Sequence, residues 1–294
     1  MDRLTLTAAV AAAGAAAYAG VRLAQRRGHT AAAALSLGVS GSEKQWLILV
    51  RHGDRHDYSV GDSWSAKIKR LGGRARDPPL SALGHRQAAA FGRAAAAAVA
   101  ERGGSVRVRT SPYLRCLQTS MPLCDLVDAP LEVEPRAAEI HHKVANYAPY
   151  GERFAYFPRL VDAEDPTVEE EDWPVGYMER IGRFGAELTS ELDDELDAPG
   201  TSTTVVTSHA ASVALVAWLL DVELTPELKF APAGCYVLAR NAKSEPWRLL
   251  RSGDNNAPYV SENSKTTFPW GYKPEYLQKW AGTHRATYPA PTRR

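Results

Sequence analysis

Three short segments of the sequence combine histidine, arginine and hydroxyl side chains in a way that suits the binding of an anion. They are residues 50–55 (VRHGDR), 109–115 (RTSPYLR) and 207–210 (TSHA). Guanidinium groups match the oxygens of a phosphate in pairs. A neutral imidazole is a competent nucleophile towards phosphorus at physiological pH. The three segments together therefore predict phosphoryl transfer.

The two histidines of these segments are expected to have different roles. His52 is predicted to be the nucleophile, with its second ring nitrogen held as a donor so that the attacking nitrogen is free. His209 would contact the phosphoryl oxygens as negative charge redistributes over them. The guanidinium groups of Arg51, Arg55 and Arg115 would bind the same oxygens.

Each of these segments lies at the end of a short run that is typical of a buried strand. The runs are residues 46–50, 106–109 and 203–207. In an open parallel sheet, ligands bind beyond the carboxyl ends of the strands. We therefore expect the three polar segments to converge on one pocket.

Helices alternate with these strands. Ser81 is predicted to cap a helix that ends near residue 101. Ser111 is predicted to cap a second helix that reaches residue 127, with Pro112 in its first turn. Pro122 should kink or shorten this second helix. The other expected elements are helices at 176–196 and 210–220 and strands at 131–133, 235–239 and 247–251. This alternation predicts an α/β three-layer sandwich with a mainly parallel central sheet.

The overall composition is that of an ordinary globular protein, with 294 residues, 45% hydrophobic and 23% charged. The net charge of +1 gives no strong field to attract nucleic acid, and no nucleic-acid partner is expected. Cys116, Cys124 and Cys235 have no CxxC spacing and are predicted to be buried free thiols. No spacing of histidine and carboxylate residues suggests a metal site, and no cofactor is expected.

Residues 1–42 differ from the rest of the chain and are left out of the predicted fold. Residues 4–21 are uncharged and rich in alanine, and Arg22, Arg26 and Arg27 follow them. This pattern favours a membrane anchor that leaves the catalytic domain on the cytoplasmic side. A cleaved signal peptide, an organellar presequence and a disordered leader are the alternatives.

The remainder of the sequence is expected to form one domain and a tail. The domain would span residues 43–254, which hold all the strands and helices described above. Residues 255–294 form the tail, and its aromatic side chains are expected to pack on the surface of the domain.

Five stretches of the sequence resemble motifs of the histidine phosphatase superfamily, which has the phosphoglycerate-mutase-like fold. They are residues 49–53 (LVRHG), 79–88 (PLSALGHRQA), 110–119 (TSPYLRCLQT), 133–139 (VEPRAAE) and 206–210 (VTSHA). The resemblance covers nearly the whole of the expected domain. It implies that His52 becomes phosphorylated and that Arg51, Arg115 and His209 bind the phosphoryl group.

The residue after His209 separates branches of this superfamily. Acid phosphatases and phytases usually carry an aspartate there as the proton donor, whereas this sequence has Ala210. The chain is more similar to the ubiquitin-associated, SH3-containing phosphatases and the ecdysteroid-phosphate phosphatases, and Arg55 also fits that branch. This similarity implies that Glu139 is the general acid. Asp54 is the rival donor, because it lies close to the nucleophile in the sequence.

Three functions are compatible with these residues. The expected one is hydrolysis of a phosphate monoester, on a phosphorylated small molecule or a phosphoprotein. A phosphoglycerate-type phosphomutase would use the same residues. A membrane-tethered module that binds phosphate without turnover is the third alternative.

Two irregular regions are expected to shape the entrance to the pocket. They are the loop 54–79 and the insertion within residues 139–172. His141 and His142 of the insertion lie close to Glu139 in sequence and could touch the substrate. The aromatic side chains of this region either stack on a leaving group or pack as core; they are Tyr147, Tyr150, Tyr156 and Trp173.

Overall fold

The structure is a computed structural model. It describes residues 36–57, 74, 76–139, 147–155, 157, 159–165, 175–220, 229–253, 259, 268 and 269. The interpretations of residues 4–21, and those of His141, His142, Tyr156 and Trp173, lie outside the described residues. Among the residues that are described, no helix has the length and apolar character needed to cross a membrane.

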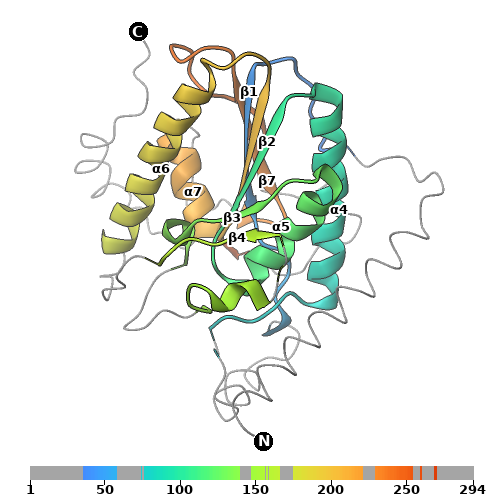
Figure 1. The fold of residues 1–294 in the computed structure, drawn as a ribbon, viewed down its shortest axis with the longest axis vertical. Helices are drawn as coiled ribbons and strands as arrows, with labels where there is room; N and C mark the ends of the chain where they lie inside the picture. The colour runs from blue at the N-terminus through green and yellow to red at the C-terminus, as the bar shows by residue number, and fades with distance from the viewer. Residues whose placement is uncertain are drawn as a thin grey trace, which may run out of the picture.

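A seven-stranded sheet with the order β4-β3-β2-β5-β1-β7-β8 forms the centre of the domain (Figure 1). Strand β1 (Gln45–Arg51) is parallel to β5 (Ser202–Ser208), and β5 is parallel to β2 (Ser105–Thr110). Strands β3 (Leu131–Val133) and β4 (Leu160–Val161) extend the parallel part. On the other side of β1, β7 (Cys235–Arg240) and β8 (Arg248–Arg251) pair in antiparallel fashion. The predicted mainly parallel sheet is confirmed.

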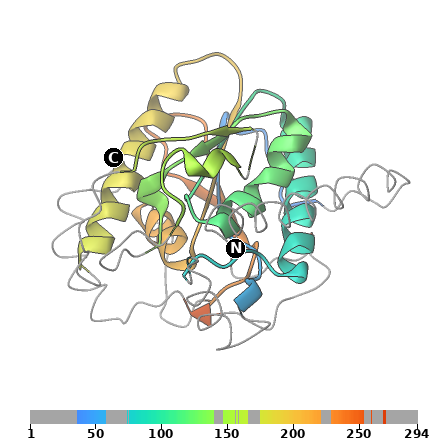
Figure 2. The same ribbon diagram turned by 60° about the horizontal axis from the view of Figure 1, so that its bottom comes forward.

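Helices cover both faces of this sheet. Helices α4 (Ala82–Arg102) and α5 (Leu114–Val127) lie on one face, and α6 (Val175–Glu195) and α7 (Ala210–Leu219) lie on the other (Figures 1 and 2). All seven side chains of β1 are buried because both faces of the strand are covered. The apolar side chains of β1 alternate between two hydrophobic clusters, one on each face. The predicted α/β three-layer sandwich is confirmed.

Helix α4 begins and ends as its sequence indicates. The Ser81 hydroxyl accepts a hydrogen bond from the Gly84 N–H, and Gly103 ends the helix with φ of 68°. The buried face of α4 consists largely of alanine and glycine. These small side chains allow a close approach to α5, and a Cβ added at Gly92 would lie 2.9 Å from the Cβ of Pro122.

The start of helix α5 differs from the prediction. The helix begins at Leu114, and Ser111 is not its N-cap. Its first N–H, that of Leu114, instead donates to the Asp77 carboxylate at 2.9 Å, so a residue distant in sequence caps the helix. Pro122 lies inside α5, and the helix continues to Val127.

The insertion contributes regular structure that the sequence analysis missed. Residues 160 and 161 form the edge strand β4, which is too short for its alternation to be recognised. A short 3₁₀ helix, η2 (Glu152–Ala155), precedes it, and another, η1 (Pro135–Ala137), follows β3. A separate two-stranded sheet of β6 (Lys229–Phe230) and β9 (Phe268–Pro269) was also not predicted.

Charged side chains join α6 to the outer strands of the sheet. The Arg107 guanidinium contacts the carboxylates of Glu132 and Glu191, each at 2.7 Å. Arg109 also contacts Glu191, at 3.0 Å. Over β2 and β3, this ion-pair network supplements the apolar packing of α6.

Candidate active site

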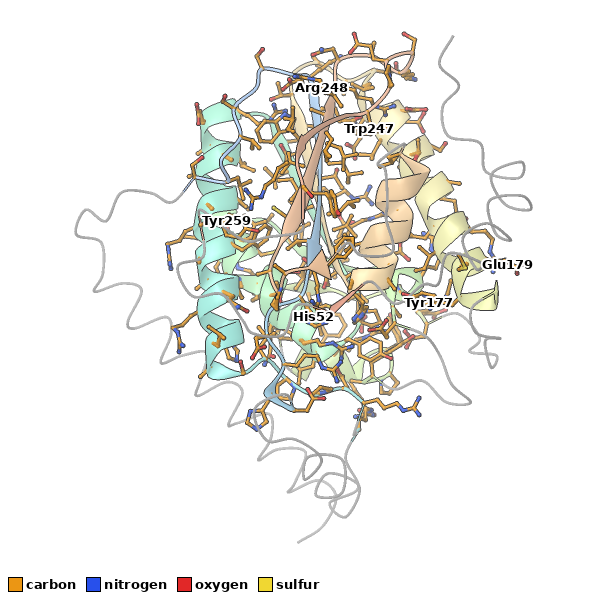
Figure 3. The ribbon with its side chains drawn as sticks, turned by 180° about the vertical axis from the view of Figure 1, so that it is seen from behind. His52, Tyr177, Glu179, Trp247, Arg248 and Tyr259 are labelled. Atoms are coloured by element: carbon orange, nitrogen blue, oxygen red, sulfur yellow. The ribbon has the colours of Figure 1, made fainter. Side chains whose placement is uncertain are left out.

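The three predicted polar segments meet at the carboxyl end of the sheet. The His52 N–H donates to the Ser208 carbonyl at 3.0 Å, and the Ser111 N–H donates to the Thr207 carbonyl at 2.9 Å. The ring centroids of His52 and His209 lie 5.4 Å apart. Figure 3 shows His52 beyond the end of the strands. The predicted convergence of the three segments is therefore confirmed.

The His52 side chain is buried and oriented by its own neighbour. Its Nδ1 lies 2.8 Å from the Gly53 carbonyl oxygen. Because a carbonyl can only accept, Nδ1 carries a proton and the Nε2 lone pair is available. Burial, followed by the charges of Arg115 and Arg51, lowers the pKa of His52 well below 6.5. The imidazole is therefore neutral at physiological pH.

Two glycines allow the loop after β1 to lie against α4. A Cβ at Gly53 would lie 2.8 Å from the Gly84 carbonyl oxygen, and a Cβ at Gly84 would lie 2.1 Å from the Asp54 carbonyl oxygen. The Gly53 N–H donates to the Thr119 hydroxyl of α5 at 3.0 Å. Helices α4 and α5 together fix the backbone immediately after the nucleophile.

His209 lies at the centre of a set of polar contacts. Its Nε2 lies 2.9 Å from the Ser111 hydroxyl, and its Nδ1 lies 3.1 Å from an Arg115 nitrogen. The Tyr113 ring meets its ring edge-on, with the centroids 4.9 Å apart. Burial and the Arg115 charge lower the pKa of His209 well below 6.5, so this imidazole is also neutral.

Arg115 projects from the first turn of α5 and is 1% exposed. Its guanidinium lies 4.4 Å from the centroid of the Tyr113 ring and 3.7 Å from the Asp77 carboxylate. Burial raises the pKa of Asp77 to about 7, although Arg115 acts in the opposite direction. Asp77 was not predicted from the sequence, because neither its loop position nor its spacing indicates this contact.

The other two predicted arginines also lie beside the nucleophile's loop. One arm of the Arg51 guanidinium donates to the Phe230 carbonyl. Arg55 forms a two-pronged contact with the Asp57 carboxylate, with nitrogen–oxygen distances of 3.0 and 2.5 Å. Arg55 is partly exposed, whereas Arg51 is buried.

The structure brings Glu139 into this cluster. Its carboxylate lies 3.2 Å from His209 Nδ1 and 3.6 Å from an Arg115 nitrogen. The side chain is 32% exposed and therefore reaches solvent. Arg180 of α6 donates to the carbonyls of Ala138 and Glu139 at 3.2 and 3.1 Å. Arg180 is a second contributor that sequence spacing did not indicate.

Asp54 has a different environment. Its carboxylate accepts a hydrogen bond from the Ser81 hydroxyl at 2.7 Å, and the side chain is buried. Its backbone N–H donates to Gln87, and its carbonyl accepts from the Ser81 N–H. All of these contacts join the loop to the start of α4.

The remaining predictions concern aromatic residues, metals and cysteines. Tyr147 is buried against Tyr113, with ring centroids 5.2 Å apart, whereas Tyr150 is exposed. Within the described part of the chain, no group of three metal-ligating side chains is present. The three cysteines are buried and free, as predicted.

A sequence model of the histidine phosphatase superfamily (branch 1) matches residues 47–255. The chain belongs to this superfamily. A comparison with curated proteins found no significant match.

Three solved phosphatase structures are similar to this chain. The ecdysone phosphate phosphatase from Bombix mori is 20% identical with a TM-score of 0.54, and the match covers 77% of this chain and 98% of that one. A phosphoserine phosphatase from Entamoeba histolytica is 17% identical with a TM-score of 0.44, covering 72% and 99%. A mycobacterial glucosyl-3-phosphoglycerate phosphatase is 20% identical with a TM-score of 0.44, covering 71% and 98%.

Proposed function

We propose that this histidine phosphatase hydrolyses a phosphate monoester through a phosphohistidine on His52. One observation carries the proposal: the Nδ1 of the buried His52 ring is hydrogen-bonded to the Gly53 carbonyl oxygen at 2.8 Å, beside His209. This tautomer leaves Nε2 as the nucleophile. The guanidinium groups of Arg51, Arg55 and Arg115 compensate the charge of the phosphoryl group.

The reaction would proceed in two steps. In the first, His52 Nε2 forms a bond to phosphorus while the bond from phosphorus to the ester oxygen breaks. Glu139 donates a proton to that departing oxygen, and the alcohol leaves. In the second, a water oxygen forms a bond to phosphorus while the bond from phosphorus to His52 Nε2 breaks, Glu139 accepts a proton from the water, and inorganic phosphate and neutral His52 are released. His209 and Arg115 hold the equatorial oxygens in both steps.

Glu139 is a better candidate for the acid than Asp54. The Glu139 carboxylate contacts both His209 and Arg115 and is accessible to solvent, so it can exchange protons between turnovers. The Asp54 carboxylate is buried and accepts from the Ser81 hydroxyl at the start of α4. We assign Asp54 to holding the loop against the helix.

The ester itself is proposed only by class. The branch that the sequence resembles, and the shared fold of the ecdysone phosphate phosphatase, favour a phosphorylated small molecule with an apolar alcohol. Tyr150 and Phe154 of the insertion have about half of their surface exposed, and their contact with a hydrophobic alcohol is part of the proposal.

The first experiment compares the wild type with His52→Ala on an aryl phosphate. We expect a loss of at least about 1000-fold in kcat, because the nucleophile is removed. Rapid quenching with labelled substrate should trap an acid-labile phosphoryl group on the wild type alone. Equal rates in the two proteins would reject the proposal. Isomer exchange of phosphoglycerate without phosphate release would favour the mutase, and phosphate binding without turnover would favour the non-catalytic module.

The acid is tested with leaving groups of different basicity. Glu139→Gln should reduce kcat by about 100-fold or more for an alkyl phosphate and much less for p-nitrophenyl phosphate, whose alcohol leaves without a proton. Asp54→Asn is the matched control, because its amide oxygen can still accept from Ser81. If Asp54→Asn instead lowered kcat selectively for the alkyl phosphate, Asp54 rather than Glu139 would be the general acid.

A further inference from the structure

A turn at residues 231–234 is hydrogen-bonded to the backbone of Arg51 and His52. The Gly234 carbonyl accepts from the Arg51 N–H at 3.0 Å, and the Ala233 N–H donates to the His52 carbonyl at 3.2 Å. The Phe230 carbonyl, just before the turn, accepts from the Arg51 guanidinium. A displacement of this turn would therefore move both the nucleophile and a phosphate-binding arginine.

The conformation of this turn is unfavourable for its sequence. Ala233 has φ of 57°, in the left-handed region that sterics disfavour for any residue with a Cβ. A hydrogen bond of 2.8 Å from the Gly234 N–H to the Ala231 carbonyl closes the turn. A strained residue of this kind persists only where its surroundings hold it in place.

Tyr259 supplies a contact that holds Ala233. Its hydroxyl donates to the Ala233 carbonyl at 2.5 Å, and the side chain is fully buried. Its ring packs against Phe91 of α4 with a centroid distance of 6.1 Å, and the Arg251 guanidinium lies 4.9 Å from the ring centroid. Burial raises the pKa of the Tyr259 hydroxyl well above 10, so the group remains a donor.

Tyr259 lies outside residues 47–255, the part of the chain that matches the superfamily model. Figure 3 shows Tyr259 beside α4, whereas His52 lies at the end of the strands. Its hydroxyl is connected to the nucleophile through a single residue, Ala233, whose carbonyl accepts from Tyr259 and whose N–H donates to His52.

We propose that Tyr259 is a positioning residue for the nucleophile: its hydroxyl holds the 231–234 turn, and the turn fixes the backbone of His52 and the guanidinium of Arg51. This inference rests on the proposed role of His52. Tyr259 would thereby act on the geometry of the active site through the 231–234 turn.

The test uses the full chain with Tyr259→Phe, which removes the hydroxyl and keeps the ring in the core. We expect kcat for an aryl phosphate to fall about tenfold, and hydrogen exchange at the Ala233 amide to accelerate by about the same factor. Ala98→Gly is the matched control: it loosens the same hydrophobic cluster near the far end of α4, lowers Tm, and leaves kcat unchanged. Adding Ala233→Gly to Tyr259→Phe should restore most of kcat, because glycine adopts the left-handed conformation without strain.

The outcomes separate this inference from the proposed function. If the wild type does not hydrolyse phosphate esters, the proposed function is rejected. The hydrogen-exchange rate at the Ala233 amide still tests the role of Tyr259, because exchange does not depend on turnover. Normal kcat and normal exchange in Tyr259→Phe, with an active wild type, would overturn the inference alone. Equal losses of kcat in Tyr259→Phe and Ala98→Gly would also overturn it and would assign Tyr259 to the core only.

Discussion

The contact between α4 and the loop after β1 predicts an unusual response to Gly84→Ala. Alanine normally stabilises a helix by about 1 kcal/mol relative to glycine. Here the added Cβ would lie 2.1 Å from the Asp54 carbonyl oxygen, whereas ordinary contact begins at 3.4 Å. The obstacle is backbone rather than a flexible side chain, so the loop must move by about 1 Å. A displacement of that size near reacting groups costs about 100-fold in rate.

We therefore expect Gly84→Ala to reduce kcat/KM about 100-fold and to lower the free energy of unfolding by about 1–3 kcal/mol. The assays are aryl phosphate hydrolysis and denaturant unfolding. Gly103→Ala is the control, since its φ of 68° makes alanine unfavourable while nothing lies within 4 Å of the added Cβ. That control should lose stability and retain kcat/KM. If Gly84→Ala gains stability and keeps full activity, the close contact does not position the nucleophile.

Three further predictions concern the same site. The pKa of His52 is lowered, so its imidazole should stay neutral as the pH falls through 6.5; an NMR titration with a midpoint at or above 6.5 would contradict this. Asp77→Asn removes a carboxylate that lies 3.7 Å from Arg115 and is ionised at pH 8. At that pH, inorganic phosphate should inhibit the variant about 3- to 10-fold more tightly than the wild type. Weaker inhibition would show that the Asp77 charge instead holds Arg115 in place. Thr119→Val leaves the buried Gly53 N–H without its side-chain acceptor, so the variant should lose about 1–3 kcal/mol of stability and have a lower kcat. An unchanged melting curve would show that the Thr119 hydroxyl does not stabilise this loop.

The sequence was sufficient to predict the elements that carry continuous local signals. Residues 46–50 form an uninterrupted apolar run, and they lie in β1, which is buried on both faces. Ser81 and Gly103 occupy the cap positions that their residue types favour. The alternation of strands and helices predicts a parallel sheet whose strands end at one edge, so the meeting of His52 with His209 could be expected before any coordinates.

The contacts that could not be predicted join residues far apart in sequence through irregular chain. Asp77 replaces Ser111 as the cap of α5, because the Ser111 hydroxyl lies against His209 instead. Arg180 lies in an amphipathic helix, where a charged residue ordinarily indicates a solvated face. Its three-dimensional position, beside the carbonyls of Ala138 and Glu139, depends on how α6 packs.

The ion pairs between α6 and the outer strands have a consequence for how the site responds to its surroundings. The α4–α5 face is held by buried alanine and other apolar side chains, and such attraction weakens on cooling. The ion pairs that Arg107 and Arg109 form with Glu191 of α6 are screened by added salt. An apolar cluster also packs α6 and α7 on the other face, so cooling should weaken both faces. Concentrated salt should act mainly on α6, whose Arg180 donates to the carbonyls of Ala138 and Glu139. The side of the active site that carries Glu139 would then be the more sensitive of the two to ionic strength.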